Sequence, residues 1–599
     1  MAVSREETQA KLSLLASGVT KHVPEQSYTV PDRFEDCARE CPHQTFLIYQ
    51  GVEITFGQLN REANRYAHVA IERGVRPGDT GAVMVENRPE FFYAWLGLSK
   101  IGAVAALINT QARGRTLSHA LEETGSKLLF LGEECTSQFA TLDGIADTVP
   151  TVYITDGESA RTLPPGMLAL DVLLEEMSSD NPSSTLRADV IGETPVFYVF
   201  TSGTTGLPKA AIISHMRWLG VGDGWASVLG MTPQDIFYCI LPLFHGAAGM
   251  SLVSNALASR ASIVVVRQFS ASNFWPDVRR YGVTIVQYVG EICRYLVNQP
   301  ARDDDKNHTL KRMTGAGMTA DVWNNFVERF GDIEILEGWG ATEANCSMMN
   351  LDGVRGSCGR IPFKEQSNAR LVQYDVENDC HITNSDRFMI ECEPGQIGEL
   401  LGMVLNIPGV GAGRFEGYVS AEATEKKILR NVLSEGDAWF RSGDLFTQDE
   451  DGYFYFSDRI GDTYRWKSEN VSTTEVTQAL EAYSPAEMIN VYGVAVPGQE
   501  GRAGMVAIEL KNNEQFDAPR FFALANENLP PYAIPLFVRV RAQSDLTVTF
   551  KLRKIELQKE GYSPANVSDP LFVLDKDAET YVPFSNSALE KLGVVAFVA

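Results

Sequence analysis

The sequence predicts an α/β fold. We expect a large amino-terminal domain of layered α/β subdomains plus a β-rich subdomain, and a small, mobile α+β carboxyl-terminal domain. A chain of 599 residues is too long for one ordinary hydrophobic core. From residue 28 to residue 190, helical patterns alternate with short apolar runs, which is typical of parallel sheets with crossover helices. Around residues 388 to 460, the pattern changes to short strands and glycine-rich turns.

The strands of the large domain are predicted from short apolar runs. Gly81–Val85 and Leu128–Leu131 belong to a first α/β layer. Ala261–Val266 and Val283–Tyr288 belong to a second one further along the chain. Because helical patterns separate these runs, the strands within each layer are expected to be parallel.

The β-rich part contains an aromatic strand, Tyr453–Phe456, that follows an Asp-Gly turn. We place a domain boundary shortly after this strand. The predicted large domain covers residues 1–458, the hinge residues 459–462, and the small domain residues 463–599.

Composition excludes several classes of function. Hydrophobic residues make up 44% and charged residues 22% of the chain, which is a globular composition. The formal net charge of -25 argues against nucleic acid as a partner. The nine cysteines are scattered, and Cys37 and Cys41 are expected to be neighbouring packed thiols rather than metal ligands. Together with a polar start that lacks a signal peptide, this pattern predicts a cytoplasmic protein.

The best candidate for a membrane segment is Phe91 to Asn109, which Lys100 interrupts. We expect a buried amphipathic helix there rather than a membrane span, and at most peripheral membrane contact for the protein. The oligomeric state stays open, with a homodimer among the allowed states.

A buried strand, Phe197–Phe200, runs into a loop rich in hydroxyl groups and glycine. The loop residues are Thr201, Ser202, Gly203, Thr204, Thr205, Gly206 and Lys209. Glycines let backbone N–H groups approach an anion, hydroxyls add donors and lysine adds a charge, so the loop is predicted to bind phosphate. It is not a Walker A loop, because that spacing is absent and Ala210–Ser214 is expected to be a returning strand. The alternative is a solvated hairpin turn.

This loop resembles the nucleotide loop of the adenylate-forming superfamily, which contains acyl-CoA synthetases, luciferases and adenylation domains. Its continuation, Lys209–His215, is similar to the fatty-acid transport protein and very-long-chain acyl-CoA synthetase branch. The resemblance extends from about residue 28 to about residue 583. It implies an AMP-forming acyl-CoA ligase that uses ATP, Mg²⁺ and coenzyme A. The implied substrate is a long-chain fatty acid or a bulky hydrophobic acid such as a sterol side-chain acid.

Further motifs match that family. Gly338–Glu343 resembles Y-G-x-T-E, which implies that Trp339 and Gly340 line adenine, Thr342 bonds phosphate and Glu343 binds Mg²⁺. The alternative is a helix start with an early acidic residue. Adenine recognition is also implied for the turn that consists of Gly315, Ala316 and Gly317, where the branch usually has Gly-Asn-Gly.

The resemblance assigns Asp444 to both ribose hydroxyls and Arg459 to a ribose or phosphate contact; a structural salt bridge is the alternative for Arg459. Lys551 is the implied catalytic lysine, which would stabilise negative charge at phosphorus, with Lys554 as the alternative. Val548 stands where the branch has glycine.

The loop that lines the pantetheine tunnel in relatives corresponds to residues 464–475, with Ser468 in place of glycine. The acyl pocket is implied near Leu241–Met250 and Tyr288–Tyr295. His245 is expected to lie near the carboxylate or to gate the pocket, with a packed core histidine as the alternative. The departures at Ser468 and Val548 leave two other functions open: acyl transfer to an amine or carrier thiol, and lipid uptake with weak ligase activity.

Overall fold

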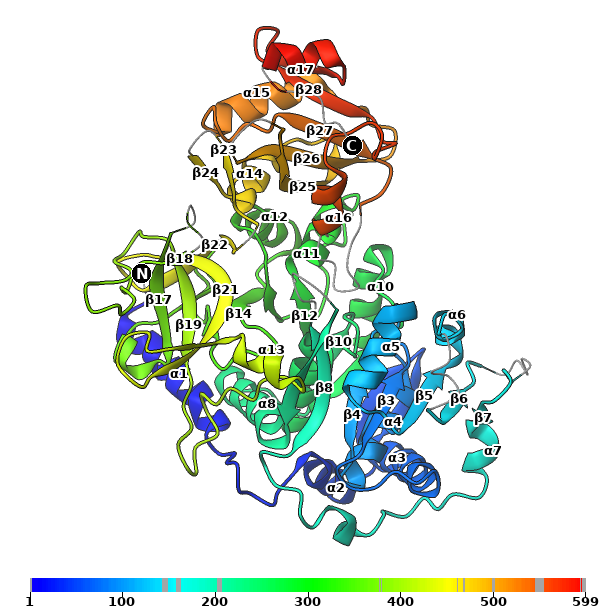
Figure 1. Cartoon of the computed structure of the whole chain (residues 1–599). Coiled ribbons are helices and arrows are strands. Elements are labelled where there is room, and N and C mark those ends of the chain that lie inside the picture. Colours follow the sequence, from blue (N-terminus) through cyan, green and yellow to red (C-terminus); the bar gives the residue numbers. More distant parts are fainter. Residues whose placement is uncertain are drawn as a thin grey trace. The chain divides into compact units, whose positions relative to one another are not determined.

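The computed structural model describes residues 3–142, 149–157, 163–201, 207–375, 378, 380–460, 462–466, 469–497, 501–544, 554–592 and 594. The chain forms two compact units (Figure 1). The first consists of Met1–Ala369 and Gly402–Arg441, and the second of Arg370–Leu401 and Ser442–Ala599. Both are mixed α/β, so the predicted fold class is confirmed.

The first unit holds two large sheets. One has the strand order β7 (Leu168–Ala169), β6 (Thr151–Ile154), β5 (Leu128–Gly132), β3 (Thr80–Met84), β4 (Val104–Leu107), β8 (Pro195–Thr201) and β9 (Lys209–Ser214). All of its neighbouring strands are parallel except β8 and β9, which form an antiparallel hairpin. The predicted returning strand after the glycine-rich loop is therefore confirmed.

The other sheet has the order β15 (Met348–Met349), β14 (Glu334–Trp339), β13 (Arg312–Ala316), β12 (Ile285–Val289), β10 (Ile236–Cys239), β11 (Ser262–Val265), β1 (Thr45–Tyr49) and β2 (Val52–Thr55). The strands from β14 to β1 are parallel, and an antiparallel strand closes each edge. The apolar runs at 261–266 and 283–288 form β11 and β12, as predicted.

Helices connect and cover these strands. They are α1 (Arg5–Val19), α2 (Val30–Glu40), α3 (Phe56–Glu72), α4 (Pro89–Lys100), α5 (Gly114–Glu123), α6 (Thr136–Phe139), α7 (Leu170–Leu174), α8 (His215–Leu229), α9 (Val253–Ser259), α10 (Ala271–Tyr281), α11 (Gly290–Asn298), α12 (Ala320–Phe330) and α13 (Ala421–Glu425). Local chemistry sets the ends of α8: the Ser214 hydroxyl accepts the Arg217 N–H, and Gly230 takes a left-handed conformation with φ +56°.

The apolar segment from Phe91 to Asn109 is a helix followed by a strand. Helix α4 ends at Lys100, and β4 follows in the middle of the sheet. Apart from Glu90 and Tyr93 its side chains are buried, so α4 is enclosed rather than amphipathic. The Lys100 ammonium is fully buried and pairs with Glu35. No helix among the described residues is both long and apolar enough to cross a membrane.

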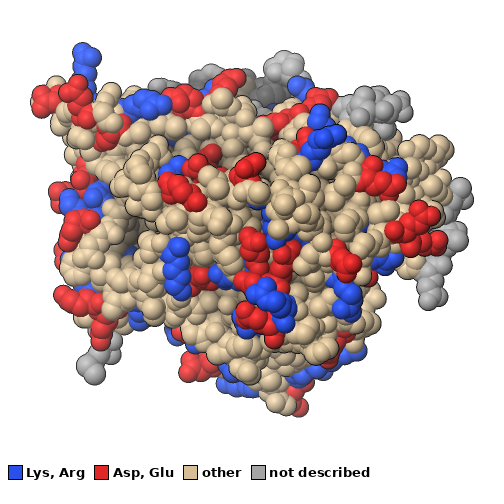
Figure 2. Space-filling view, turned by 90° about the horizontal axis from the view of Figure 1, so that it is seen from below, with Lys and Arg blue, Asp and Glu red and all other residues tan. Residues whose placement is uncertain are grey.

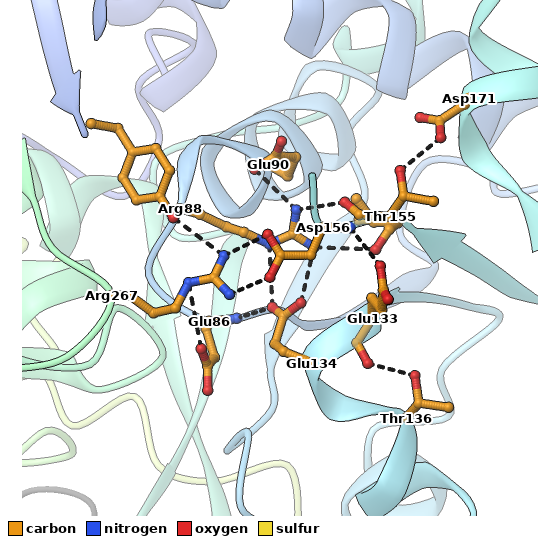
Figure 3. A network of polar contacts seen from close by, with 12 residues as sticks. Glu86, Arg88, Glu90, Glu133, Glu134, Thr136, Thr155, Asp156, Asp171 and Arg267 are labelled. Atoms are coloured by element: carbon orange, nitrogen blue, oxygen red, sulfur yellow. Dashed lines mark hydrogen bonds and ion pairs between the residues drawn. The ribbon is translucent and has the colours of Figure 1, made fainter. Parts of the chain in front are cut away.

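At the carboxyl ends of β3, β5 and β6, charged side chains form a closely knit network (Figure 3). Arg88 lies 3.1 Å from Glu134 and 3.3 Å from Glu90, and Arg267 bonds Asp156 at 2.9 Å. In open α/β sheets, ligands commonly bind at this edge. Here ion pairs between the chain's own residues occupy part of that edge.

The second unit contains a twisted sheet and a smaller layered part. The sheet places β22 (Tyr453–Arg459), β21 (Ala438–Gln448), β19 (Gly398–Met403), β17 (Ala369–Asp375) and β18 (Cys380–His381) side by side. The start of β21 belongs to the first unit, where a short strand, β20 (Ile428–Arg430), pairs with residues 438–440. The aromatic strand predicted at 453–456 is β22.

The smaller part begins with the hairpin β23 (Tyr464–Trp466) and β24 (Glu469–Val471). Its sheet has the order β25 (Ala486–Ala495), β26 (Arg502–Leu510), β27 (Phe537–Arg541), β28 (Leu571–Asp575) and β29 (Thr580–Pro583). It is covered by α14 (Thr473–Leu480), α15 (Ala518–Asn528), α16 (Ile555–Glu560) and α17 (Asn586–Leu592). Buried side chains between Tyr464 and Val594 form a hydrophobic core of their own.

Candidate functional site

The predicted phosphate loop connects β8 to β9. Its ends, Thr201 and Lys209, are direct partners across the hairpin. Ser202, Gly203, Thr204, Thr205 and Gly206 lie outside the described residues. The hairpin therefore fixes the two ends of the loop next to each other, at the edge of the first sheet.

A short extended segment, Glu416–Val419, pairs with β9 at this edge. Ala210 accepts the Val419 N–H at 2.9 Å, and Gly417 accepts the Ile212 N–H at 3.0 Å. Glu416 and Tyr418 flank Gly417, whose φ of +76° interrupts the extended backbone. This 416–419 segment brings both side chains to the predicted loop and to the Glu343 motif.

Tyr418 connects the loop to Glu343. Its hydroxyl donates to Glu343 Oε1 at 2.8 Å, and it also hydrogen-bonds with Thr201. The Lys209 ammonium lies 5.7 Å from the centre of the Tyr418 ring. Burial, followed by the nearby Glu343 carboxylate, raises the pKa of Tyr418, so its hydroxyl stays protonated and remains a donor. Three residues predicted from two separate motifs thus meet around one tyrosine.

Glu343 lies in a turn after β14. The guanidinium of Arg217, on α8, donates to the backbone oxygens of Thr342 at 2.7 Å and of Ala344 at 2.6 Å. Arg217 is in turn 4.0 Å from Glu416, whose carboxylate accepts the Ser214 N–H at 2.9 Å. No helix begins at this motif, so the helix-start alternative is wrong. The turn is fixed from two sides, by α8 and by the 416–419 segment.

Among the described residues, no three or more His, Cys, Asp or Glu side chains are grouped so that they could hold a metal ion. Glu343 is nevertheless a suitable partner for Mg²⁺, which is commonly held by one or two carboxylates together with substrate phosphates and water. Its Oε2 accepts no hydrogen bond from the described residues, while Tyr418 occupies Oε1. The Lys427 ammonium lies 3.9 Å from Oε1. One buried carboxylate with one open oxygen fits the predicted metal.

His245 and Gly246 adjoin the same turn. A Cβ atom on Gly246 would lie 2.9 Å from Thr342 Oγ1, so glycine allows this close approach. His245 precedes a π-helical turn, Gly246–Leu252, and its Nδ1 accepts the Ala247 N–H at 3.3 Å. The segment predicted to line the acyl pocket is therefore next to the predicted phosphate contact.

The turn at Gly315, Ala316 and Gly317 follows from β13 and is organised by Glu337 on the neighbouring strand β14. The Glu337 carboxylate accepts the Gly317 N–H at 3.0 Å, the Met318 N–H at 2.6 Å and the Tyr288 hydroxyl at 2.9 Å. Burial raises the pKa of Glu337 to about 7, against the opposing effect of these donors.

Trp339 lies at the end of β14 and is largely buried, whereas Gly340 after it is exposed. These two residues and the turn at 315–317 thus occupy the ends of the adjacent strands β13 and β14. A shared role of these residues in binding adenine stays a prediction.

In the second unit, Asp444 and Arg459 face each other across β21 and β22. Arg459 Nε lies 3.1 Å from Asp444 Oδ1. Glu399 supports the turn before Asp444: its carboxylate accepts the Gly443 N–H at 2.8 Å and lies 2.7 Å from the His381 ring. The salt-bridge alternative for Arg459 is confirmed, and the roles of Asp444 and Arg459 in binding ribose stay predictions.

Lys554, the alternative catalytic lysine, lies at the predicted hinge. Its ammonium donates to Thr473 Oγ1 at 2.7 Å and to Asp462 at 3.2 Å. The buried Asp458 carboxylate accepts the Thr473 N–H at 2.8 Å. Lys551, Val548, Ser468 and Gly461 lie outside the described residues. Lys554 is therefore held by hinge residues.

Sequence reasoning missed Tyr418, Arg217, Glu416, Glu337 and Glu399. Glu337 carried a usable signal, because an acidic residue inside an apolar strand needs partners. Tyr418 carried none, since its role depends on contacts with residues far away in the sequence.

Comparisons with known proteins agree with this geometry. The sequence profile of the AMP-binding enzyme family matches residues 34–401. Long-chain fatty acid transport protein 2 of Rattus norvegicus is 37% identical over 568 residues, which cover 93% of this chain and 89% of the relative. Long-chain fatty acid transport protein 1 of Mus musculus is 40% identical over 562 residues, covering 93% and 86%.

Solved structures share the fold. An anthranilate CoA ligase in complex with anthranoyl-AMP has a TM-score of 0.73 at 21% identity, over 89% of this chain and 97% of that one. The o-succinylbenzoate CoA synthetase of Bacillus subtilis, with its acyl-adenylate intermediate, has a TM-score of 0.69 at 22% identity, over 89% and 98%.

The family match and the relatives thus define an adenylate-forming enzyme, and the fold is that of the solved ligases. The chain belongs to the AMP-binding enzyme family, in the branch that contains the long-chain fatty acid transport proteins. It is an AMP-forming acid–thiol ligase, with ATP, Mg²⁺ and coenzyme A as its cofactors and co-substrates.

Proposed function

We propose that this enzyme activates a long-chain or bulky hydrophobic carboxylic acid with ATP and passes the acyl group to coenzyme A. The carboxylate attacks the α-phosphorus of ATP, giving an acyl-adenylate and pyrophosphate. The thiol of coenzyme A then attacks the acyl carbon, giving a thioester and AMP. The first step converts the poor oxide leaving group of the acid into AMP, so no covalent enzyme intermediate is needed.

The observation that carries this proposal is the meeting of Thr201, Lys209 and Glu343 around Tyr418. A glycine- and hydroxyl-rich loop that ends beside a carboxylate with a free oxygen suits a triphosphate with its cation. Mg²⁺ bound there would neutralise phosphate charge. Thr342 would bond phosphate, and Asp444 and Arg459 would hold the ribose.

The acid is the least constrained part. The names of the relatives refer to long-chain fatty acids, and the family profile covers the segments that we assign to the acyl pocket. A panel of acids from C6 to C24, together with sterol side-chain acids, should be tested for pyrophosphate release. Release that is highest with long-chain acids supports the proposal, and no release with any acid overturns it.

A second experiment identifies the acceptor. In the proposed reaction, coenzyme A accelerates AMP release and a thioester accumulates. If AMP release is indifferent to coenzyme A while hydroxylamine traps an acyl group, the acceptor is an amine or a carrier thiol. We also propose that the small domain, residues 463–599, rotates about residues 459–462 between the two steps and exchanges Lys551 for the loop at 464–475.

The word transport in the names of the relatives favours a second role, in fatty acid uptake by trapping the acid as its thioester. Peripheral membrane contact, a homodimer and a cytoplasmic location would be compatible with it. Uptake that persists in a variant without pyrophosphate release would separate transport from ligation.

A further inference from the structure

We propose that Tyr418 is a positioning residue that fixes the Glu343 carboxylate against the phosphate loop, so that one oxygen is presented to the cation of Mg·ATP. This inference rests on the proposed function of the site, but it concerns a residue that carries no part of the family motifs described above. Its support comes from three features: a fixed backbone, a directional hydrogen bond, and placement between two motifs.

The backbone of Tyr418 is fixed from both sides. The backbone N–H of Tyr418 donates to Thr424 Oγ1 at 2.9 Å, and the Thr424 hydroxyl donates to the backbone carbonyl oxygen of Tyr418 at 3.1 Å. Tyr418 is also the bridge partner of Ala211 on β9. The side chain therefore starts from a position set by two elements, α13 and β9.

The hydroxyl acts in one direction. It donates to Glu343 Oε1, while its own oxygen interacts with Thr201 at the end of β8. The relay from Thr201 through Tyr418 to Glu343 ties the carboxylate to the end of β8, and it uses Oε1 only. The neutral phenol bonds Oε1 at 2.8 Å and leaves the charge of the carboxylate in place, while the Lys427 ammonium lies further from the same oxygen, at 3.9 Å. Partners of a metal-binding carboxylate commonly set its affinity in this way.

Lys209 also contacts Tyr418. Its ammonium lies over the Tyr418 ring, 5.7 Å from the centre. Tyr418 thus contacts Lys209 through its ring and Glu343 through its hydroxyl.

The decisive variant is Tyr418→Phe, which keeps the ring and removes the hydroxyl. Binding of ATP should be measured by calorimetry at increasing MgCl₂, in the absence of acid so that no reaction occurs. We expect the Mg²⁺ concentration for half-maximal binding to rise about tenfold, as for other partners of metal ligands. Binding of ATP without Mg²⁺ should change little. An unchanged Mg²⁺ dependence would overturn the proposal.

The matched control is Tyr238→Phe. Tyr238 lies on β10 and is also buried, and its hydroxyl donates to the Asp277 carboxylate at 2.7 Å. We expect Tyr238→Phe to lower the melting temperature as Tyr418→Phe does. The Mg²⁺ dependence of ATP binding should stay unchanged. If both variants shift the Mg²⁺ dependence equally, the effect is general loosening, and the positioning role fails.

A double variant tests the route of action. In a Glu343→Ala background, Tyr418→Phe should have no further effect on Mg²⁺-dependent ATP binding, because it acts through the missing carboxylate. An undiminished effect there would assign Tyr418 a direct contact and overturn the proposal. Pyrophosphate release by the wild type is a separate readout: its absence with every acid would refute the ligase function, while the binding data would still decide the role of Tyr418.

Discussion

Neutral groups donate hydrogen bonds to several buried carboxylates of this chain. Tyr418 donates to Glu343, Tyr288 donates to Glu337, and Thr473 donates to Asp458. A hydroxyl or N–H group orients a carboxylate but leaves its negative charge in place, whereas an ion pair with arginine compensates it. Asp444, which is expected to contact ribose, instead pairs with an arginine, as do the carboxylates of the network in Figure 3.

Glu337 makes a prediction about pH. Burial moves its pKa from an ordinary value of 4.5 to about 7, so between these values the folded chain keeps a proton that the unfolded chain has lost. Its contribution to stability is therefore complete below about pH 4.5 and is lost as the pH rises through about 7. Relative to Glu337→Gln, the free energy of unfolding of the wild type should fall by about 3 kcal/mol between pH 4.5 and pH 7.

Urea midpoints between pH 4.5 and pH 8 check this expectation. Glu334→Gln, at an exposed position on the same strand, is the control and should follow the wild type. A constant difference between the wild type and Glu337→Gln across the window would show that the carboxylate does not titrate there.

Asp444 makes a prediction about nucleotide affinity. Asp444→Asn removes the charge that pairs with Arg459 and that is expected to accept both ribose hydroxyls. We expect the KM for ATP to rise by about ten- to a hundredfold, because charge-assisted hydrogen bonds contribute about 1.5–3 kcal/mol. The KM for the acid should change little. Steady-state pyrophosphate release measures both, with Asp451→Asn in the exposed turn after β21 as the control.

At the scale of elements, the 416–419 segment matters because it contacts both β9 and the turn at Glu343, which are far apart in the sequence. It adds a short strand to β9 and brings Glu416 and Tyr418 to the turn at Glu343. Gly417 makes this possible. Its φ of +76° favours glycine, and a Cβ atom there would lie 2.6 Å from Thr424 Cγ2.

Replacing this glycine tests the segment. Gly417→Ala should destabilise the chain by about 1–3 kcal/mol and weaken Mg·ATP binding, because strain and the Thr424 contact add up. Gly409→Ala is a matched control: its φ is +73°, but nothing lies within 4 Å of the added Cβ. It should show only the smaller conformational cost. Equal melting temperatures for the two variants would contradict the role assigned to the Thr424 contact.

At the scale of the whole molecule, the fold could be predicted further than the site. Strands such as β3, β5 and β11 were predictable because their apolar runs are local signals. The partners of Glu343 were not, since Tyr418 and Arg217 act through contacts more than seventy residues away. Residues with motif spacing were found, and residues that orient them were missed.

The two units also predict the course of unfolding. Phe521 in the small core and Phe92 in α4 are both fully buried. Phe521→Ala and Phe92→Ala should each cost about 3–5 kcal/mol. In scanning calorimetry, we expect two transitions, with Phe521→Ala lowering one midpoint and Phe92→Ala the other. A single transition that moves in both variants would show that the units unfold together.

The distance in sequence between Thr201 and Tyr418 has a consequence for synthesis on the ribosome. Both large sheets of the first unit are encoded before residue 350, so they can fold while the rest of the chain is still being made. The free side of β9 in the hairpin β8–β9 can pair with the 416–419 segment only after that segment has been synthesised. A nascent chain that stalls before residue 416 would hold the nucleotide motifs of the first unit and would still lack Tyr418, the partner of Glu343.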